Sequence, residues 1–258
     1  MKKVTLGEVR DFWNSRPCNI RHGLAPLGTR EYFDQVEARK YMVEPHIPGF
    51  SEFERWNGKK VLEIGCGIGT AASSFAKAGA IYTGIELSEK SLEITKQRFE
   101  VLGLKGEFYL GNAEELSQFL PAQKYDLIYS FGVIHHAPNP EKIIQQIRAY
   151  MDKESELRIM LYAKNSWKNI MIESGLDQPE AQSGCPIAFT YTEEEVRELL
   201  KGFKVKEIKQ DHIFPYIVEK YVKYEYQLQP WFQSMPKEMF RALETMLGWH
   251  LLIKASLA

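Results

Sequence analysis

The sequence has little cysteine, no excess of either charge and no long apolar run. Its three cysteines, Cys18, Cys66 and Cys185, are odd in number and far apart among 258 residues. This argues against a disulfide framework and suits a reducing cytoplasm. Lys and Arg number 33 against 34 Asp and Glu, which gives a formal net charge of −1. Without a basic run or a strongly positive region, the sequence gives no indication of a nucleic-acid partner.

Signals for membrane insertion and export are also missing from the sequence. No window reaches the about 18 apolar residues of a transmembrane helix, and the first residues, Met1–Val4, lack the apolar region of a signal peptide. No internal repeat or low-complexity tract is present. We therefore expect a cytoplasmic protein with no membrane partner, and its hydrophobic share of 44% is sufficient for an ordinary core.

The pattern of apolar and polar residues changes near residue 59. Residues 1–58 are polar, aromatic and irregular, with several prolines as breakers. From Lys59 onward, apolar strands alternate with helical patterns, which predicts βαβ units, a parallel sheet and an α/β fold. Strands are expected at Lys60–Ile64, Ala80–Glu86, Lys105–Leu110, Tyr125–Ser130, Leu157–Ala163, Phe203–Gln210 and Trp249–Ser256.

Start signals for helices lie between these strands. Ser88 is predicted as an N-cap, and Pro140 stands at the first position of another helix. The run Thr192–Glu195 matches a capping box, in which a threonine and a glutamate satisfy each other's backbone amides. These signals support alternation of strands and helices along most of the chain.

The most informative motif is the run Val61–Thr70, in which apolar residues and Glu63 lead into glycines at 65, 67 and 69. The run predicts a buried strand, a tight loop and the start of a helix. A nucleotide-like cofactor can approach such a loop closely, because no Cβ intervenes. A dinucleotide fingerprint is G-x-G-x-x-G, but here the third glycine comes one residue early. The Glu63 carboxylate would repel a pyrophosphate and suits a ligand that carries a cation.

The pattern acid-x-Gly-x-Gly-x-Gly resembles motif I of the class I S-adenosylmethionine-dependent methyltransferases. The resemblance implies a doubly wound, mostly parallel, seven-stranded sheet and S-adenosylmethionine as the cofactor. It also implies that the loop passes over the methionine part of the cofactor, whose ammonium group lies among carbonyls and an acid. The residues expected to hold this end are Glu63, Gly65, Cys66, Gly67 and Gly69.

Further motifs of this family follow at later strand tips. Glu86 ends the second predicted strand, where an acid can accept hydrogen bonds from both ribose hydroxyls, and Leu87 would pack on the adenine. Asn112 stands where the family often has an aspartate that accepts from the adenine amino group. Its carbonyl oxygen can do the same, or the residue forms an Asx-turn after the strand. Ala113 and the strand-tip residue Ser130 complete the expected cofactor site.

A histidine pair, His135-His136, follows the fourth predicted strand. Small-molecule methyltransferases of this fold often show such a pair here. Methyl transfer is an in-line displacement in which positioning supplies most of the catalysis. An alcohol or phenol also needs its proton removed, which a histidine can do at neutral pH, whereas an amine or thiolate needs no base. Either histidine is predicted as the base, and the alternative is that one of them shapes the loop.

Three segments outside the resemblance are expected to gather at the carboxyl ends of the strands, where open α/β sheets bind ligands. Residues 1–58 would form an N-terminal lid. Within the methyltransferase domain, residues 59–258, the segments 164–189 and 211–248 would be insertions that cap the substrate, the second of them helical and placed before the last strand. Residues 211–248 are aromatic-rich and could instead form the surface of a homodimer.

Three residues of the N-terminal segment are candidates for closing the site. Arg16 could grip a carboxylate or phosphate of the substrate, and the rings of Tyr32 and Tyr41 could cover the sulfonium. The alternative for such an arginine is an ordinary solvated charge on a surface helix.

The sequence thus predicts a methyltransferase that acts on an O or N nucleophile of a small-molecule metabolite. One alternative acceptor is a peptide or protein side chain, and another alternative is a non-catalytic partner subunit that binds S-adenosylmethionine. Cys18 and Cys185, each in a lid segment, favour a thiol or metalloid acceptor as a third alternative, but a third thiolate is missing. Cys18 with His22 is too sparse for a zinc site, so no metal is expected. The acceptor itself is not specified by the sequence.

Overall fold

In the computed structural model, residues 4–175 and 184–258 are described. They form one mixed sheet with the strand order β3-β2-β1-β4-β5-β8-β7 and a short strand, β6, paired with β5. The strands are β1 Lys60–Ile64, β2 Ile81–Glu86, β3 Glu107–Leu110, β4 Leu127–Phe131, β5 Glu156–Ala163, β6 Thr190–Tyr191, β7 Phe203–Asp211 and β8 His250–Leu257. The predicted α/β fold and all seven predicted strands are confirmed, and the two-residue strand β6 is an addition.

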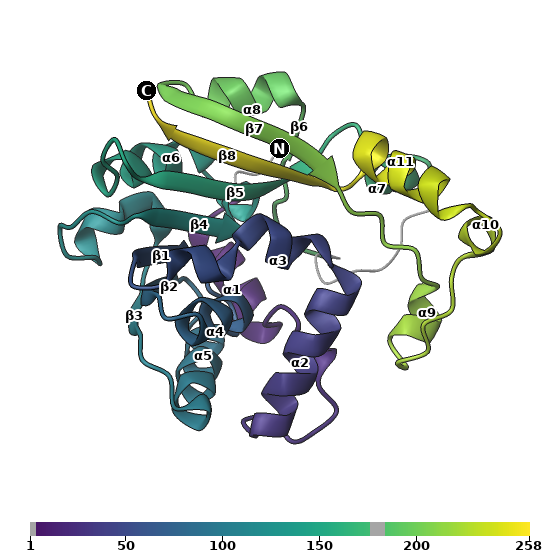
Figure 1. Cartoon of the computed structure of the whole chain (residues 1–258), viewed down its shortest axis with the longest axis horizontal. Coiled ribbons are helices and arrows are strands. Elements are labelled where there is room, and N and C mark those ends of the chain that lie inside the picture. The colour runs from purple at the N-terminus through teal and green to yellow at the C-terminus, as the bar shows by residue number, and fades with distance from the viewer. Residues whose placement is uncertain (1–3, 176–183) are drawn as a thin grey trace.

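The sheet is parallel from β3 to β5, and β8 runs antiparallel to both of its neighbours. Figure 1 shows β8 lying between β5 and β7, although β7 precedes it in the chain. All eight residues of β5 are buried, as expected for an inner strand that is covered on both faces.

Helices cover both faces of the sheet. The predicted starts are confirmed: Ser88 caps α5, Pro140 begins α6, and Thr192 forms a capping box on α8. The helices are α1 Leu6–Ser15, α2 Arg30–Val43, α3 His46–Ser51, α4 Thr70–Lys77, α5 Glu89–Leu102, α6 Pro140–Ala149, α7 Trp167–Glu173, α8 Glu193–Leu199, α9 Val218–Tyr221, α10 Pro230–Gln233 and α11 Lys237–Leu247. Short 3₁₀ turns lie at η1 Ile20–His22, η2 Phe53–Trp56, η3 Ala113–Gln118 and η4 Ile134–His136.

Two apolar clusters on opposite faces of the sheet make up the core. The alternation of side chains along β1 separates them, because Leu62 and Ile64 join the cluster under α6 and α8, whereas Val61 joins the cluster under α4 and α5. Within α6, Ile143 and Ile147 are one helical turn apart and both are buried. This packing fixes the strand tips that form the site.

The N-terminal segment is joined to the sheet domain by buried polar contacts. The fully buried guanidinium of Arg98 on α5 donates to Thr70 Oγ1 (2.9 Å) and to the carbonyl of Phe33 on α2 (3.1 Å). At the other end of α5, Ser88 Oγ donates to Asn14 Oδ1 (2.9 Å) at the end of α1. The helices α1 and α2 therefore lie directly against the elements that follow the glycine loop.

The segment between β7 and β8 contacts the same N-terminal helices. The guanidinium carbon of Arg39 on α2 lies 4.1 Å from the centre of the Tyr221 ring and 3.8 Å from that of Tyr224. Arg39 Nη2 also donates to the carbonyl of Tyr221 (2.5 Å). In the described part of the chain, no helix has the length and apolar character needed to cross a membrane.

Candidate functional site

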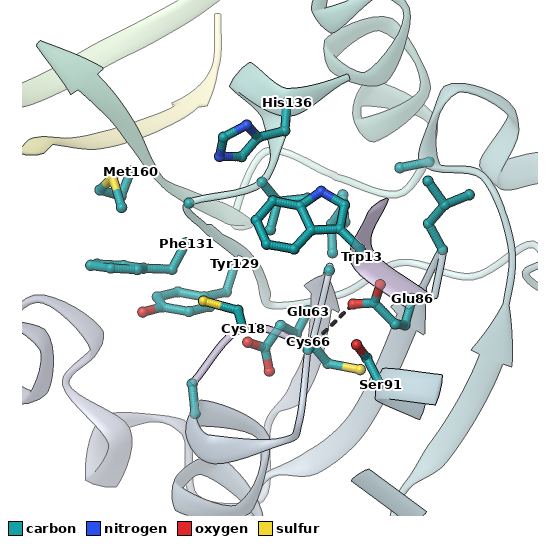
Figure 2. A pocket seen from close by; sticks show the side chains of 18 of the residues that line it. Trp13, Cys18, Glu63, Cys66, Glu86, Ser91, Tyr129, Phe131, His136 and Met160 are labelled. Atoms are coloured by element: carbon teal, nitrogen blue, oxygen red, sulfur yellow. Dashed lines mark hydrogen bonds between the residues drawn. The ribbon is translucent and has the colours of Figure 1, made fainter. Parts of the chain in front are cut away.

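A cavity of about 210 Å³ lies at the carboxyl ends of β1, β2 and β4. The strand tips and the glycine loop form one wall, and residues of α1 and α2 form another. Figure 2 shows Glu63 and Glu86 near the glycine loop, and the His136 and Trp13 rings beside each other. Open α/β sheets bind ligands at this edge. All of the predicted cofactor residues except Gly69 and Ser130 line the cavity.

The glycine loop takes the conformation that its sequence predicts. Gly65, Gly67 and Gly69 all have φ in the left-handed region, at 75°, 56° and 79°. A Cβ on Gly65 would come 2.4 Å from Val133 Cγ2, whereas a Cβ on Gly67 would meet no heavy atom within 4 Å. Position 65 therefore needs glycine for space and conformation, and position 67 leaves its backbone open to a ligand.

Glu63 lines the cavity from β1 and is almost fully buried. Its Oε2 accepts a hydrogen bond from the Tyr82 hydroxyl (2.6 Å). Burial raises the pKa of Glu63 to about 8, against the lowering effect of the Tyr82 hydrogen bond. A cationic group bound beside Glu63 would favour its ionised form, so this carboxyl suits an ammonium ligand.

Glu86 is held rigidly at the tip of β2. Its Oε2 accepts from the backbone amide of Gly67 (2.8 Å), and its Oε1 accepts from that of Ser88 (2.9 Å). Burial raises its pKa, and these backbone amides oppose the rise. Each carboxylate oxygen can accept a second hydrogen bond, which leaves Glu86 able to receive two hydroxyls of a diol.

The predicted adenine end lies beyond Glu86. Leu87, Asn112 and Ala113 line this part of the cavity. Asn112 also forms the Asx-turn that was the alternative interpretation, because its Oδ1 accepts from the amide of Glu114 (2.9 Å) and caps η3. The two readings are compatible, since the same oxygen has a second lone pair.

Ser130 lies elsewhere than the sequence analysis expected. Its side chain is fully buried, is not part of the cavity lining, and donates from Oγ to the carbonyl of Ile64 (3.1 Å). This bond joins β4 to β1. The next residues, Phe131 and Gly132, line the cavity instead.

The histidine pair divides between cavity and core. His136 lines the cavity, and its Nδ1 lies 2.8 Å from the carbonyl oxygen of Ile187. Because a carbonyl only accepts, Nδ1 carries the proton of the neutral ring and Nε2 is left as an acceptor. Nε2 is buried without a partner in the described part of the chain. Burial lowers the pKa of His136 to about 4, so the ring is neutral at physiological pH.

His135 does not reach the cavity lining. It is fully buried, and its ring centre lies 3.8 Å from that of Tyr162. Burial lowers its pKa well below the usual range. Of the two predicted bases, the geometry therefore favours His136.

Of the three candidate lid residues, one lines the cavity and two do not. Tyr41 lines the cavity, with its hydroxyl 2.7 Å from Ser74 Oγ. Tyr32 does not line it, because its ring packs in the cluster with Phe33 and its hydroxyl donates to the carbonyl of Ile20 (2.7 Å). Arg16, at the end of α1, is also outside the lining.

Trp13 lines the cavity although it was not among the three predicted lid residues, and its ring centre lies 5.3 Å from that of His136. Leu6, Val9 and Trp13 form one stripe of α1, and all three line the cavity. Their spacing of three and four residues was an available signal of an apolar helix face.

A separate polar group, which was not predicted, lines the cavity near Phe131, on the opposite side from Glu86 in Figure 2. Lys40 and Glu44 come from α2 and its end, and His250 begins β8. Lys40 Nζ forms an ion pair with Glu44 Oε2. Cys18 lies in the same lining, and burial raises the pKa of its thiol.

Comparisons with known proteins show the family and the fold of the chain. A family model described as a methyltransferase domain matches residues 56–207. The ubiquinone biosynthesis O-methyltransferase of Actinobacillus pleuropneumoniae is 34% identical over 103 residues, which cover 39% of this chain and 44% of that protein. The ubiquinone biosynthesis O-methyltransferase of Bordetella parapertussis is 38% identical over 93 residues, which cover 36% of this chain and 38% of that protein. The matched segment thus spans less than half of either relative.

Solved structures match over more of the chain. A magnesium protoporphyrin IX methyltransferase from Synechocystis, solved with bound S-adenosylhomocysteine (SAH), covers 98% of this chain and 100% of its own. The TM-score is 0.63 and the sequence identity 18%. At this identity the likeness concerns the fold, and it extends through the N-terminal segment.

Proposed function

Because the chain belongs to the methyltransferase-domain family, we propose that it transfers the methyl group of S-adenosylmethionine to a hydroxyl oxygen of a small-molecule metabolite. The observation that carries the choice of oxygen is His136, a neutral imidazole with an unpartnered Nε2 in the cavity lining. The curated relatives are named O-methyltransferases, which supports the same choice.

The residues present suit this cofactor. Glu63 is a buried carboxyl that would become ionised beside an ammonium group, and Gly67 leaves space over the backbone of the loop. Glu86 would receive the ribose hydroxyls, and Leu87 and Asn112 would contact the adenine. When bound, S-adenosylmethionine supplies a methyl group on a sulfonium that is already a good leaving group.

The chain's own residues would then position the acceptor and receive its proton. His136 Nε2 would accept the hydrogen of the acceptor hydroxyl, and Nδ1 stays bonded to the Ile187 carbonyl (2.8 Å). As the acceptor oxygen is methylated, its proton would pass to Nε2, which would then carry it as part of an imidazolium ring. Trp13 and Tyr41 cover the cavity from α1 and α2, which supports a small acceptor over a protein side chain.

Incubation with methyl-labelled S-adenosylmethionine and a protein-free metabolite extract tests this proposal. We expect label in a small molecule, and the absence of labelled product in every fraction would refute it. Label retained in polypeptide from an added protein extract would favour the peptide alternative.

The role of His136 needs a separate variant. His136→Gln is expected to lower kcat/KM about 10²- to 10⁴-fold with unchanged affinity for S-adenosylmethionine. His22→Gln is the matched control, because His22 is another histidine with a lowered pKa but bonds Tyr221, outside the cavity lining. Equal turnover of the two variants would remove His136 from the mechanism.

A further inference from the structure

We propose that Glu44 and His250, which line the cavity, and His212, which lies beside them, form a binding site for one divalent transition-metal ion. One ligand atom from each of these residues lies within 4.8 Å of the other two. Ligand atoms around a tetrahedral zinc ion lie about 3.3 Å apart, given bond lengths near 2.0–2.1 Å. Coordination would therefore require the three side chains to rotate so that their ligand atoms move closer together.

The three residues come from distant parts of the chain. Glu44 follows α2, His212 follows β7, and His250 begins β8. His212 and His250 are buried, with 7% and 3% of their surface exposed, and the Glu44 side chain is 13% exposed. Buried polar groups are normally hydrogen-bonded, and buried charges are normally paired or bound to a metal.

The backbone holds His212 in place. Its φ is 76°, in the left-handed region that residues other than glycine adopt infrequently. The carbonyl of His212 accepts from the amide of Trp249 (2.7 Å), and its amide donates to Asp211 Oδ1 (2.9 Å). The β7 and β8 ends thus present His212 and His250 side by side, with ring centres 4.7 Å apart.

A second layer of contacts orients the ligands. His250 Nδ1 lies 3.0 Å from His46 Nε2, which leaves His250 Nε2 on the side of Glu44, 3.8 Å from its Oε1. Lys40 pairs with the other oxygen, Oε2. Each of these two ligands therefore has one polar atom already bonded and the other facing the proposed ion, which is how metal-binding imidazoles and carboxylates are usually held.

The ligand set indicates the class of metal. Two imidazoles and one carboxylate suit zinc or another first-row transition ion, whereas calcium and magnesium prefer oxygen ligands throughout. Three protein ligands leave a coordination position open. Because Glu44 and His250 line the cavity, that position would face the acceptor, and an acceptor hydroxyl bound there would lose its proton more easily. This last step rests on the proposed function, but metal binding does not.

Metal binding can be measured on the full chain after treatment with a chelator. Cobalt(II) is the spectroscopic probe, because its visible absorption intensifies when it leaves water for a tetrahedral or five-coordinate site. We expect saturation at one equivalent, competition by zinc, and a zinc-dependent rise in Tm of the wild-type protein. Absence of saturable binding at one equivalent would overturn the inference without recourse to any variant.

Variants locate the site. Glu44→Gln, His250→Gln and His212→Asn are each expected to weaken cobalt binding at least about 100-fold, since each loses one of three ligands, and asparagine tolerates the left-handed backbone of position 212. His22→Gln is the control and should bind as the wild type does. Circular dichroism checks that each variant is folded, and one folded variant is sufficient to decide. Unchanged binding in a folded variant would overturn the assignment.

Activity is a separate readout. Metal binding without methyl transfer would leave this inference standing and refute the proposed function. Methyl transfer by a protein that binds no metal would refute this inference and leave the proposed function standing.

Discussion

Gly65 is the position of the glycine loop where an added Cβ would lie closest to another side chain. Its φ is 75°, and a Cβ there would lie 2.4 Å from Val133 Cγ2. The left-handed conformation costs a residue other than glycine about 1 to 2 kcal/mol. Forcing a methyl group into packed side chains adds about 1 to 3 kcal/mol. Gly65→Ala is therefore expected to lower the free energy of unfolding by about 2 to 5 kcal/mol.

Gly67→Ala is the matched control for this substitution. Gly67 also has a positive φ, of 56°, but a Cβ there meets no heavy atom within 4 Å. Only the conformational cost of about 1 to 2 kcal/mol applies. Urea denaturation of the wild type and both variants, without cofactor, gives the two values. Equal destabilisation would refute the steric reasoning, because it would mean that Val133 moves aside without cost.

A third substitution isolates the contact itself. Val133→Ala removes the two carbons at 2.4 and 2.6 Å, while the Val133 Cβ at 3.0 Å remains. In that background, Gly65→Ala should cost about 1 to 3 kcal/mol less than in the wild type. An unchanged cost would show that the two Cγ atoms contribute nothing, and would leave the backbone conformation and the Cβ contact as the cause.

Three further predictions concern other residues. Burial raises the pKa of Glu63 from 4.5 to about 8, so between these pH values the folded protein keeps a proton that the unfolded chain releases. Stability should therefore fall as the pH rises from about 4.5 to about 8. Glu63→Gln should flatten the dependence of Tm on pH, and parallel curves of Tm against pH for the wild type and the variant would contradict the assignment. Arg39→Ala removes cation–π contacts with the Tyr221 and Tyr224 rings, which contribute about 0.5 to 2 kcal/mol each. Hydrogen exchange of the backbone amides in α9 should therefore become faster, and an unchanged exchange rate would show that other contacts hold α9. Ser130→Ala should cost about 1 kcal/mol of stability and leave the affinity for S-adenosylmethionine unchanged; a large loss of affinity would return Ser130 to the cofactor site.

The loop and strand-tip residues that line the cavity could be predicted from the sequence because their signals are local. The loop, Glu63 and Glu86 all lie within two neighbouring strands and the turns that follow them. A strand tip, a glycine loop and a helix start place their residues at a common edge whatever the rest of the chain does. The same local logic located the helix starts at Ser88, Pro140 and Thr192.

Only one of the two predicted lid tyrosines lines the cavity, and the reason is geometric. Tyr32 and Tyr41 are nine residues apart on α2, which corresponds to about two and a half helical turns. Such residues lie on opposite faces of a helix, so only one of them could reach the cavity. The helix boundaries and this spacing together could have excluded the pair.

Two features could not be predicted in this way: which side chain of β4 meets the cavity, and the cluster of Glu44, His212 and His250. Every residue of Leu127–Ser130 is buried, so alternation along β4 does not say which side chain meets the cavity. Glu44, His212 and His250 are brought together only by long-range packing. No periodic pattern connects positions so far apart in the sequence.

The place of β8 inside the sheet has a consequence for synthesis. During translation, β7 leaves the ribosome long before β8, the strand that lies between it and β5. Until His250–Leu257 emerge, β7 has no neighbour in the sheet, and one edge of the apolar strand β5 offers unpaired amides and carbonyls to other chains. The nascent protein therefore depends on one late strand to close its sheet, and slow release of that strand would favour aggregation over folding.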